Sequence, residues 1–452
     1  MGLFDWLFGK KKKDPYGGSF RQDYDSGRSY NDQPVERYQS KATRRPPAVE
    51  SPRQKHRTGK LSFRRLRSNQ ALDPLPDQTL DGRNPNTGQL TGSPLSHLGG
   101  TRQAPDPHTD AQRLRNHGLP VVEHLDDLAE LLGTARDELV YLSARPTVEE
   151  PTHYTLKELP KKSGGTRLLM VPMPRLKSLQ RTLNAKLISL LPVHDCVHGF
   201  RTGRDVLSSA SAHVSKDVLV SMDIEDFFPS FTFRRVAGYF RSLGYGRGTC
   251  VALANLTTFR LADASVKRSN RNAWKLASVH HHPDAMRRWH PELPQGAPTS
   301  PGIANAIARR MDKRLHALAL KFGADYTRYA DDLTFSGGEE LAKGVGRLLM
   351  LARKIVKTEG LALNENKTRI MRKGRQQRVT GVVVNQQTNV SRRDFDKLKA
   401  ILHNCIKHGP GGQNRESVPD FKEHLRGRIA HISHIGPERG RKLKAMFEQI
   451  RW

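Results

Sequence analysis

Cysteine is scarce in this chain of 452 residues, and the three that occur, Cys196, Cys250 and Cys405, lie far apart. An odd number of distant cysteines forms neither a disulfide framework nor a zinc cluster, which excludes the small disulfide-rich and zinc-finger classes. Sparse cysteine also fits a reducing compartment, so we expect a cytoplasmic protein.

Long hydrophobic runs are also lacking, and no stretch approaches the roughly 20 apolar residues that span a bilayer. Near the start, an apolar segment precedes Lys10–Lys13, which reverses the order found in a secretory signal peptide. Trp6 stands where a myristoylation pattern requires Ser or Thr. We therefore expect no stable membrane insertion, and interpret this segment as a disordered end or a short amphipathic patch.

Acidic residues are few relative to basic ones. The chain has 45 Asp and Glu against 76 Lys and Arg, which gives a formal net charge of +31. A single basic cluster is usually a solvated surface, but an excess over the whole chain indicates a polyanionic partner. Nucleic acid is the first candidate for that partner, and an anionic membrane surface is the second.

Periodic apolar residues are missing between about 14 and 118, a segment rich in Pro, Ser, Arg, Gln, Asn and Gly. Such a segment cannot bury enough apolar surface to offset the entropy lost on ordering. Residues 1–120 are therefore predicted to form a disordered basic extension, with structure beginning near Val121.

The remaining sequence predicts an α+β fold. Helical spacing of apolar residues appears at 124–132 and 176–191, and a strand pattern at 168–171. Short apolar strands alternate with helices from 217 to 385, and the pattern is helical from 394 onward.

Three carboxylates dominate the candidate chemistry. A buried-strand pattern ends at Asp223, while Asp331 and Asp332 stand between two strand patterns, 326–329 and 333–335, which predicts a hairpin. If the first strand lies beside the hairpin, the three carboxylates converge and repel one another unless cations lie between them. Two Mg²⁺ ions would relieve that repulsion and suit nucleotidyl transfer. An Asp pair alone is more often a solvated turn.

A rigid turn with close backbone approach is predicted where Gln295 and Gly296 lead into Pro298 and Pro301. Such a turn can support a templating base and an incoming sugar. Taken alone, it would be interpreted as a loop that leads into the helix predicted over 303–318.

Two further sets of side chains are candidates for binding a nucleotide. Phe228 could lie under the ribose and exclude a 2′-hydroxyl group, whereas Phe227 is predicted to pack in the core. Arg167, with Lys161 or Lys162, could hold a triphosphate, although a solvated basic turn is the alternative interpretation.

These features together resemble motifs A, B and C of reverse transcriptases, in the family's order, and the resemblance covers about 155–452. The matching segments are Asp223 with Phe227-Phe228-Pro229-Ser230, the turn Gln295–Pro301, and Tyr329-Ala330-Asp331-Asp332. Val379-Thr380-Gly381 is similar to an element typical of retron enzymes. Ser209-Ala210-Ser211-Ala212-His213 is similar to the retron Asn-Ala-x-x-His element, with Ser in place of Asn.

The resemblance implies a right-hand polymerase with fingers over 121–204, a palm over 205–390 and a helical thumb over 391–452. Lys367 matches the motif D lysine, which would act as a general acid toward pyrophosphate; a surface lysine is the alternative. In the thumb, RNA binding is predicted for a basic set, Arg439, Arg441 and Lys442.

The resemblance also implies an activity. The enzyme would copy a structured noncoding RNA from a guanosine 2′-hydroxyl, using deoxynucleoside triphosphates, to give a branched RNA–DNA hybrid. It would serve in antiphage defence, usually with a separate effector protein. The alternatives are a diversity-generating or group II intron-derived reverse transcriptase, and a non-catalytic RNA scaffold on the same fold. Residues 262–293 are interpreted as an RNA-contacting insertion or a solvated loop.

Overall fold

The computed structural model describes residues 106, 108–144, 153–160, 166–260 and 291–452. The described residues exclude most of the predicted basic extension and nearly all of the predicted insertion. They also exclude Lys161 and Lys162. Within the described part, no helix combines the length and apolar character needed to cross a membrane.

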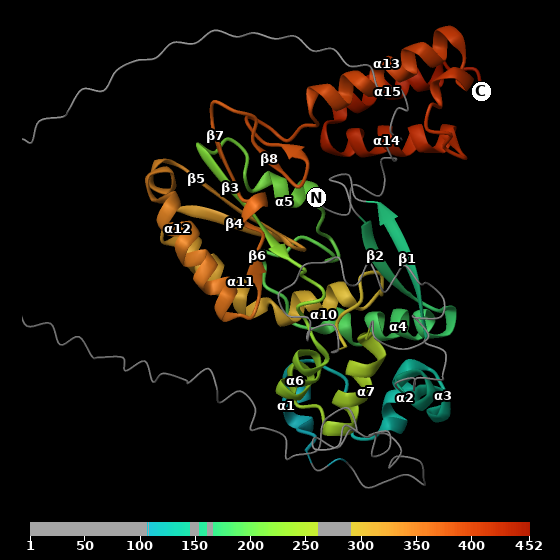
Figure 1. Cartoon of the computed structure of the whole chain (residues 1–452), viewed down its shortest axis with the longest axis vertical. Coiled ribbons are helices and arrows are strands. Elements are labelled where there is room, and N and C mark those ends of the chain that lie inside the picture. The colour runs from blue at the N-terminus through green and yellow to red at the C-terminus, as the bar shows by residue number, and fades with distance from the viewer. Residues whose placement is uncertain (1–105, 107, 145–152, 161–165, 261–290) are drawn as a thin grey trace, which may run out of the picture. The chain divides into compact units, whose positions relative to one another are not determined.

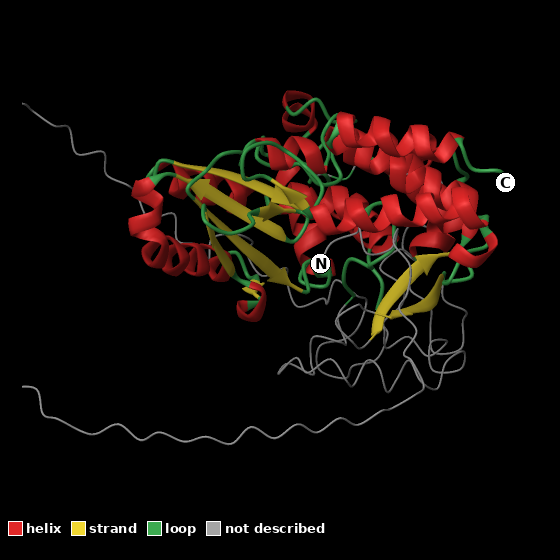
Figure 2. Cartoon of the chain, turned by 90° about the horizontal axis from the view of Figure 1, so that it is seen from above, coloured by secondary structure: helices red, strands yellow, loops and turns green. Residues whose placement is uncertain are grey.

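A five-stranded sheet lies at the centre of the described chain, in the order β4-β5-β3-β6, with β7 also paired to β3 (Figures 1 and 2). All of its pairings are antiparallel. Because β3 lies inside the sheet, its apolar run is buried on both faces, as the pattern before Asp223 predicts. The strands are β3 (Val218–Glu225), β4 (Ala324–Tyr329), β5 (Asp332–Gly337), β6 (Ala362–Leu363) and β7 (Arg369–Arg372).

Two helices, α11 (Arg309–Leu320) and α12 (Glu339–Thr358), pack on this sheet (Figure 1). In α12 the residues at three- and four-residue spacing, among them Leu341, Val345 and Leu348, are buried. The helix expected over 303–318 is in fact two helices, α10 (Ser300–Ile307) and α11, which meet at Ala308. Helix α10 follows directly after the turn at Gln295 and Gly296.

The first part of the described chain is mainly helical, with a separate two-stranded sheet. Its elements are α1 (Ala111–Asn116), α2 (Leu125–Leu132), α3 (Arg136–Ser143), β1 (Tyr154–Pro160), β2 (Thr166–Pro172), α4 (Pro174–Lys186), η3 (Ile188–Leu190), α5 (Val206–Ser211), α6 (Phe233–Leu243) and α7 (Arg247–Thr257).

The prediction that structure begins near Val121 is wrong, because α1 lies before that residue. Leu114 of α1 is fully buried, and the Asp110 backbone N–H donates to the Gly244 carbonyl at 2.8 Å. A six-residue helix with one buried side chain is too short to show a helical period.

The end of the chain is helical, as predicted, and forms a second hydrophobic cluster. This cluster also includes side chains of α5 and of a small hairpin, so its packing crosses the palm–thumb boundary predicted at residue 390. The hairpin consists of β8 (Arg378–Val379) and β9 (Val382–Val383). The helices of the cluster are α13 (Arg392–His408), α14 (Phe421–Ile435) and α15 (Pro437–Glu448). Two short 3₁₀ helices also occur in this half of the chain: η5 (Glu365–Lys367) lies between β6 and β7, and η6 (Gly411–Gln413) lies between α13 and α14.

Candidate active site

The three aspartates lie together at one end of the central sheet. Strands β4 and β5 form a hairpin whose closing pair is Tyr329 and Asp332, so Ala330 and Asp331 form a two-residue turn. Strand β3 pairs with β5 in a register that places Asp223 opposite Asp332. The Ile224 N–H also donates to the Asp331 carbonyl at 2.9 Å. The predicted adjacency of strand and hairpin is therefore confirmed.

Burial and mutual repulsion shape the electrostatics of these carboxylates. Burial, followed by the charge of Asp331, raises the pKa of Asp332 to about 7. Burial, followed by the charge of Asp223, raises the pKa of Asp331. The site therefore resists holding all of these negative charges unless cations approach it.

One cation within the chain already approaches the site. Lys367 Nζ lies 2.9 Å from both carboxylate oxygens of Asp223. The Asp223 side chain is 5% exposed, whereas that of Lys367 is 44% exposed. The predicted general acid is thus held at a carboxylate of the site, from which it must be released to reach a substrate.

The donor set suits a hard divalent cation, because carboxylate oxygens are the ligands that Mg²⁺ prefers. Burial, followed by the charge of neighbouring carboxylates, raises the pKa values of Asp331 and Asp332, and a bound cation would offset both effects. As the side chains stand, however, no three His, Cys, Asp or Glu groups among the described residues surround one point. Lys367 is the charged partner of Asp223 in this arrangement.

A buried arginine supports the turn that carries Asp331. Arg328 and Asp312 are both fully buried, and two guanidinium nitrogens donate to the Asp312 carboxylate at 2.7 Å each. Arg328 Nη1 also donates to Asn305 Oδ1 at 2.9 Å and to the Ala330 carbonyl at 3.1 Å. Ala330 has a φ of +56°, which an L residue rarely adopts. The arginine therefore links α10 and α11 to the aspartate turn.

The predicted turn at Gln295 and Gly296 lies against β2, the strand that carries Arg167. The Met170 N–H donates to the Gln295 carbonyl at 2.8 Å. Gly296 has a φ of +125°, and a Cβ atom there would lie 3.0 Å from the Met170 carbonyl oxygen. Close backbone approach is therefore confirmed, and the structure brings this turn and Arg167 onto neighbouring segments.

Phe227 and Phe228 differ as predicted. Phe227 is 5% exposed and belongs to the main hydrophobic core. Phe228 is only partly buried, and its ring centroid lies 6.3 Å from that of Phe200. Phe228 is thus the more exposed of the two, and its contact with a substrate stays a prediction.

The Ser209–His213 element has a structural role in the sheet. His213 is fully buried and shares hydrogen bonds with Ser336 Oγ at 2.6 Å and Thr327 Oγ1 at 2.7 Å. Ser209 Oγ also bonds to Thr327 Oγ1, at 3.1 Å. Burial lowers the pKa of His213 to about 4, so its imidazole is neutral near pH 7. The element fastens α5 to β4 and β5.

The sequence is similar to those of known proteins. Residues 159–384 match the family described as reverse transcriptase (RNA-dependent DNA polymerase). The chain is 40% identical over 334 residues to the retron Mx65 reverse transcriptase of Myxococcus xanthus, covering 74% of this chain and 73% of that protein. It is 38% identical over 378 residues to the retron Mx162 reverse transcriptase of the same organism, covering 79% and 74%.

The chain belongs to the retron reverse transcriptases. A relative from Escherichia coli, the retron Ec86 reverse transcriptase, is 29% identical over 332 residues, covering 73% of this chain and 90% of that protein. Membership confirms the predicted right-hand polymerase fold and the predicted activity: the enzyme is an RNA-directed DNA polymerase. Reverse transcriptases generally use divalent metal ions, which agrees with the carboxylate donor set.

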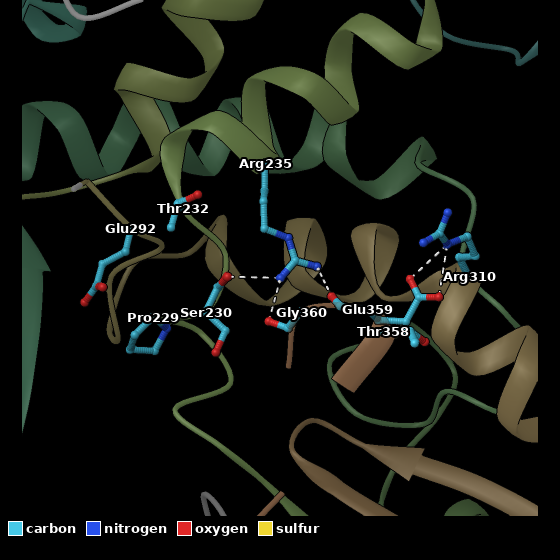
Figure 3. A pocket seen from close by; sticks show the side chains of 9 residues that line it. All are labelled: Pro229, Ser230, Thr232, Arg235, Glu292, Arg310, Thr358, Glu359 and Gly360. Carbon is cyan, nitrogen blue, oxygen red and sulfur yellow. Dashed lines mark hydrogen bonds and ion pairs between the residues drawn. The ribbon is translucent and has the colours of Figure 1, made fainter. Parts of the chain in front are cut away.

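A pocket of about 430 Å³ in this reverse transcriptase lies next to the segment that follows Phe228 (Figure 3). None of the three aspartates lines it. Arg235 donates to the carbonyls of Ser230 and Glu359 at 3.1 and 2.9 Å, and Arg310 is paired with the Glu359 carboxylate at 2.9 Å. These charged groups are therefore bonded within the protein. Arg235 links Ser230, in motif A, to Glu359 at the end of α12.

The three predicted RNA-binding cations of the thumb lie in different environments. Arg439 donates from Nη1 to the Val390 carbonyl at 2.8 Å, and its guanidinium packs over the Phe395 ring. Arg441 and Lys442 are exposed, and Arg441 has only a distant ion pair with Glu438 at 3.8 Å. Arg439 therefore has a clear structural role, whereas the other two face solvent.

Proposed function

We propose that this reverse transcriptase uses Asp223, Asp331 and Asp332 to hold two Mg²⁺ ions and extends a primed end of a structured noncoding RNA into DNA. The observation that carries the proposal is the meeting of three aspartates at one end of the sheet in a retron reverse transcriptase. When bound, the ions would polarise the reacting phosphate and stabilise the leaving pyrophosphate.

Four further groups have proposed roles. Arg167 and Lys162 bind the triphosphate, because Arg and Lys suit phosphate oxygens and Arg167 lies on β2. Gln295 and Gly296 support the nucleotide through the turn that is bonded to β2. Phe228 excludes the 2′-hydroxyl of a ribonucleotide. Lys367, once it leaves Asp223, donates a proton to the leaving pyrophosphate.

The proposed product is a branched RNA–DNA hybrid, in which the DNA begins at a guanosine 2′-hydroxyl of the RNA. This proposal is supported by the identity to retron enzymes over about three quarters of the chain. A role in antiphage defence, with a separate effector protein, is the corresponding proposal for the cell.

The nucleic acid that copurifies with the protein from its native cells tests the product. We expect a single DNA species joined to one RNA, with a residual ribonucleotide branch that survives ribonuclease and is cleaved by a debranching enzyme. DNA that carries no RNA branch would contradict retron priming and favour a diversity-generating or intron-derived enzyme. Copurified RNA with no DNA at all would favour an RNA scaffold.

The exposed thumb cations give a second test. Each phosphate contact makes the fall of log affinity with log salt steeper by roughly one unit. The double variant Arg441→Ala/Lys442→Ala is therefore expected to bind the copurifying RNA more weakly, with a salt slope reduced by about two units.

A matched control removes the same charge elsewhere. Lys343→Ala/Lys354→Ala changes two exposed lysines of α12, outside the proposed thumb, and should leave the slope unchanged. Arg439 is left intact because its loss would disturb the contact with Val390. An unaltered slope for the thumb variant would show that Arg441 and Lys442 do not contact the RNA.

A further inference from the structure

Phe200 combines two features that rarely occur together. Its side chain is 38% exposed, and its φ of +58° lies in the left-handed region. An exposed aromatic ring contributes little to core packing, and a bulky residue in this region is unfavourable. Backbone strain of this kind persists only where the surrounding structure imposes it, and it concentrates at functional sites.

The segment that ends at Phe200 is fixed to the aspartate hairpin. The His198 N–H donates to the Arg328 carbonyl at 2.9 Å, and the Arg328 N–H donates to the Cys196 carbonyl at 2.8 Å. Asn305 Nδ2 donates to the Gly199 carbonyl at 2.9 Å. The groups that hold the Asp331 turn therefore also hold the backbone before Phe200.

Gly199 shows how close this approach is. A Cβ atom at residue 199 would lie 2.7 Å from the Ala330 backbone nitrogen, so only glycine fits there. Since Ala330 directly precedes Asp331, Phe200 and Asp331 each lie one residue from this contact. The position of the Phe200 ring is thus tied to that of the aspartate turn.

Three aromatic rings lie near one another on three segments that are linked to the aspartates in sequence or by close backbone approach. The Phe200 centroid lies 6.3 Å from the Phe228 centroid and 6.3 Å from the Tyr329 centroid. Phe228 follows Asp223 by five residues, and Tyr329 precedes Asp331 by two. An apolar wall next to an acidic end proposed to bind metal suits a nucleotide, whose base has a flat face that stacks on aromatic rings and whose phosphates need cations.

We propose that Phe200 contacts the sugar and base of a nucleotide held at the three aspartates, and is therefore a substrate-binding residue. The inference rests on the proposed function of those aspartates. Two nucleotides share this chemistry: the incoming deoxynucleoside triphosphate and the 3′-terminal nucleotide of the primer. Core packing does not account for Phe200, because its ring is neither buried nor part of either hydrophobic cluster.

The test uses the full-length chain with Phe200→Ala, Phe200→Tyr and Tyr141→Ala. Alanine removes the ring but keeps a side chain at the same strained backbone position, and tyrosine keeps the ring. Tyr141, on α3, is 49% exposed and serves as a matched exposed aromatic outside the site. Thermal melting of each variant checks that the fold is retained.

Two measurements distinguish the two nucleotides. The first is the KM for a deoxynucleoside triphosphate, alongside kcat, on a preformed RNA template with a DNA primer. The second is the Kd of that primer–template with 2-aminopurine at the primer's 3′ end, whose fluorescence reports stacking. Loss of one base–aromatic contact is expected to weaken binding by roughly 5- to 150-fold.

Phe200→Ala is expected to raise one of these constants by that factor, while Phe200→Tyr and Tyr141→Ala stay near the wild-type values. A raised KM assigns the contact to the incoming nucleotide, and a raised Kd with brighter fluorescence assigns it to the primer end. If neither constant changes in Phe200→Ala, or if Tyr141→Ala changes them equally, the assignment of Phe200 is overturned. The proposed function fails separately if the wild-type enzyme does not extend the primer. In that case the Kd for the primer–template still tests the role of Phe200.

Discussion

Replacement of Asp331 by Asn is expected to reduce DNA synthesis by about a thousandfold or more, while RNA binding survives. The neutral amide is a poor ligand for Mg²⁺, so the variant loses charge stabilisation of the reacting phosphate. That loss is on the order of 4 kcal/mol, and each 1.36 kcal/mol corresponds to a factor of ten in rate. Single-turnover extension of a primed RNA template measures the effect, and Asp223→Asn should behave in the same way.

The stability of the Asp331→Asn variant separates a catalytic loss from unfolding. Burial, followed by Asp223, raises the pKa of Asp331 in the folded chain above its unfolded value of about 3.9. Such a group contributes stability below its unfolded pKa, and this contribution is lost as pH rises through its folded pKa. In metal-free buffer near pH 7, the melting temperature of the Asp331→Asn variant is therefore expected to equal or exceed that of wild type.

Asp325→Asn is the matched control, because Asp325 lies near the far end of β4, the strand that leads into the Asp331 turn. Its carboxylate is half-exposed and pairs with Lys216 at 2.6 Å, away from the hairpin turn. We expect nearly full activity from this variant. Near-normal extension by Asp331→Asn, or an equal loss in Asp325→Asn, would refute the metal-ligand role.

The elements that carry the aspartates were predictable because their signals are local. The apolar run before Asp223 indicates a buried strand, and the acidic pair between two strand patterns indicates a hairpin tip. The register that places Asp223 opposite Asp332 is a long-range pairing, and spacing alone does not determine it. Only the similarity of the motifs to a known family made that adjacency an expectation.

The supporting residues were missed for a different reason. Arg328 stands in a strand pattern. A charged residue in a buried strand needs a buried partner of opposite charge, and this was the signal that its sequence offered. The neutralising group, Asp312, lies on α11, and nothing in its local sequence distinguishes it from a solvated helix residue. Phe200 gave no signal of strain, because φ depends on the contacts that tertiary structure imposes.

Arg328→Met is expected to lower the free energy of unfolding by about 3–5 kcal/mol, the cost of leaving one member of a buried ion pair without its partner. Asp312 would remain fully buried, with the Tyr326 hydroxyl still donating to its carboxylate at 3.1 Å but without the guanidinium charge. Such a loss is a large part of the roughly 5–15 kcal/mol that stabilises a typical protein. Urea-induced unfolding of the variant and of wild type measures the difference.

The double variant Arg328→Met/Asp312→Leu separates the stability of the pair from its effect on the active site. Replacing both members of a buried ion pair with apolar residues of similar volume is often close to neutral, so most of the lost stability should return. Activity should not return, because the Ala330 carbonyl and Asn305 still lack the guanidinium that holds the Asp331 turn. Arg328→Lys keeps a charge for Asp312 but cannot reach all of these acceptors at once, and should be intermediate in both respects. A double variant that recovers full activity would show that the aspartate turn keeps its conformation without Arg328.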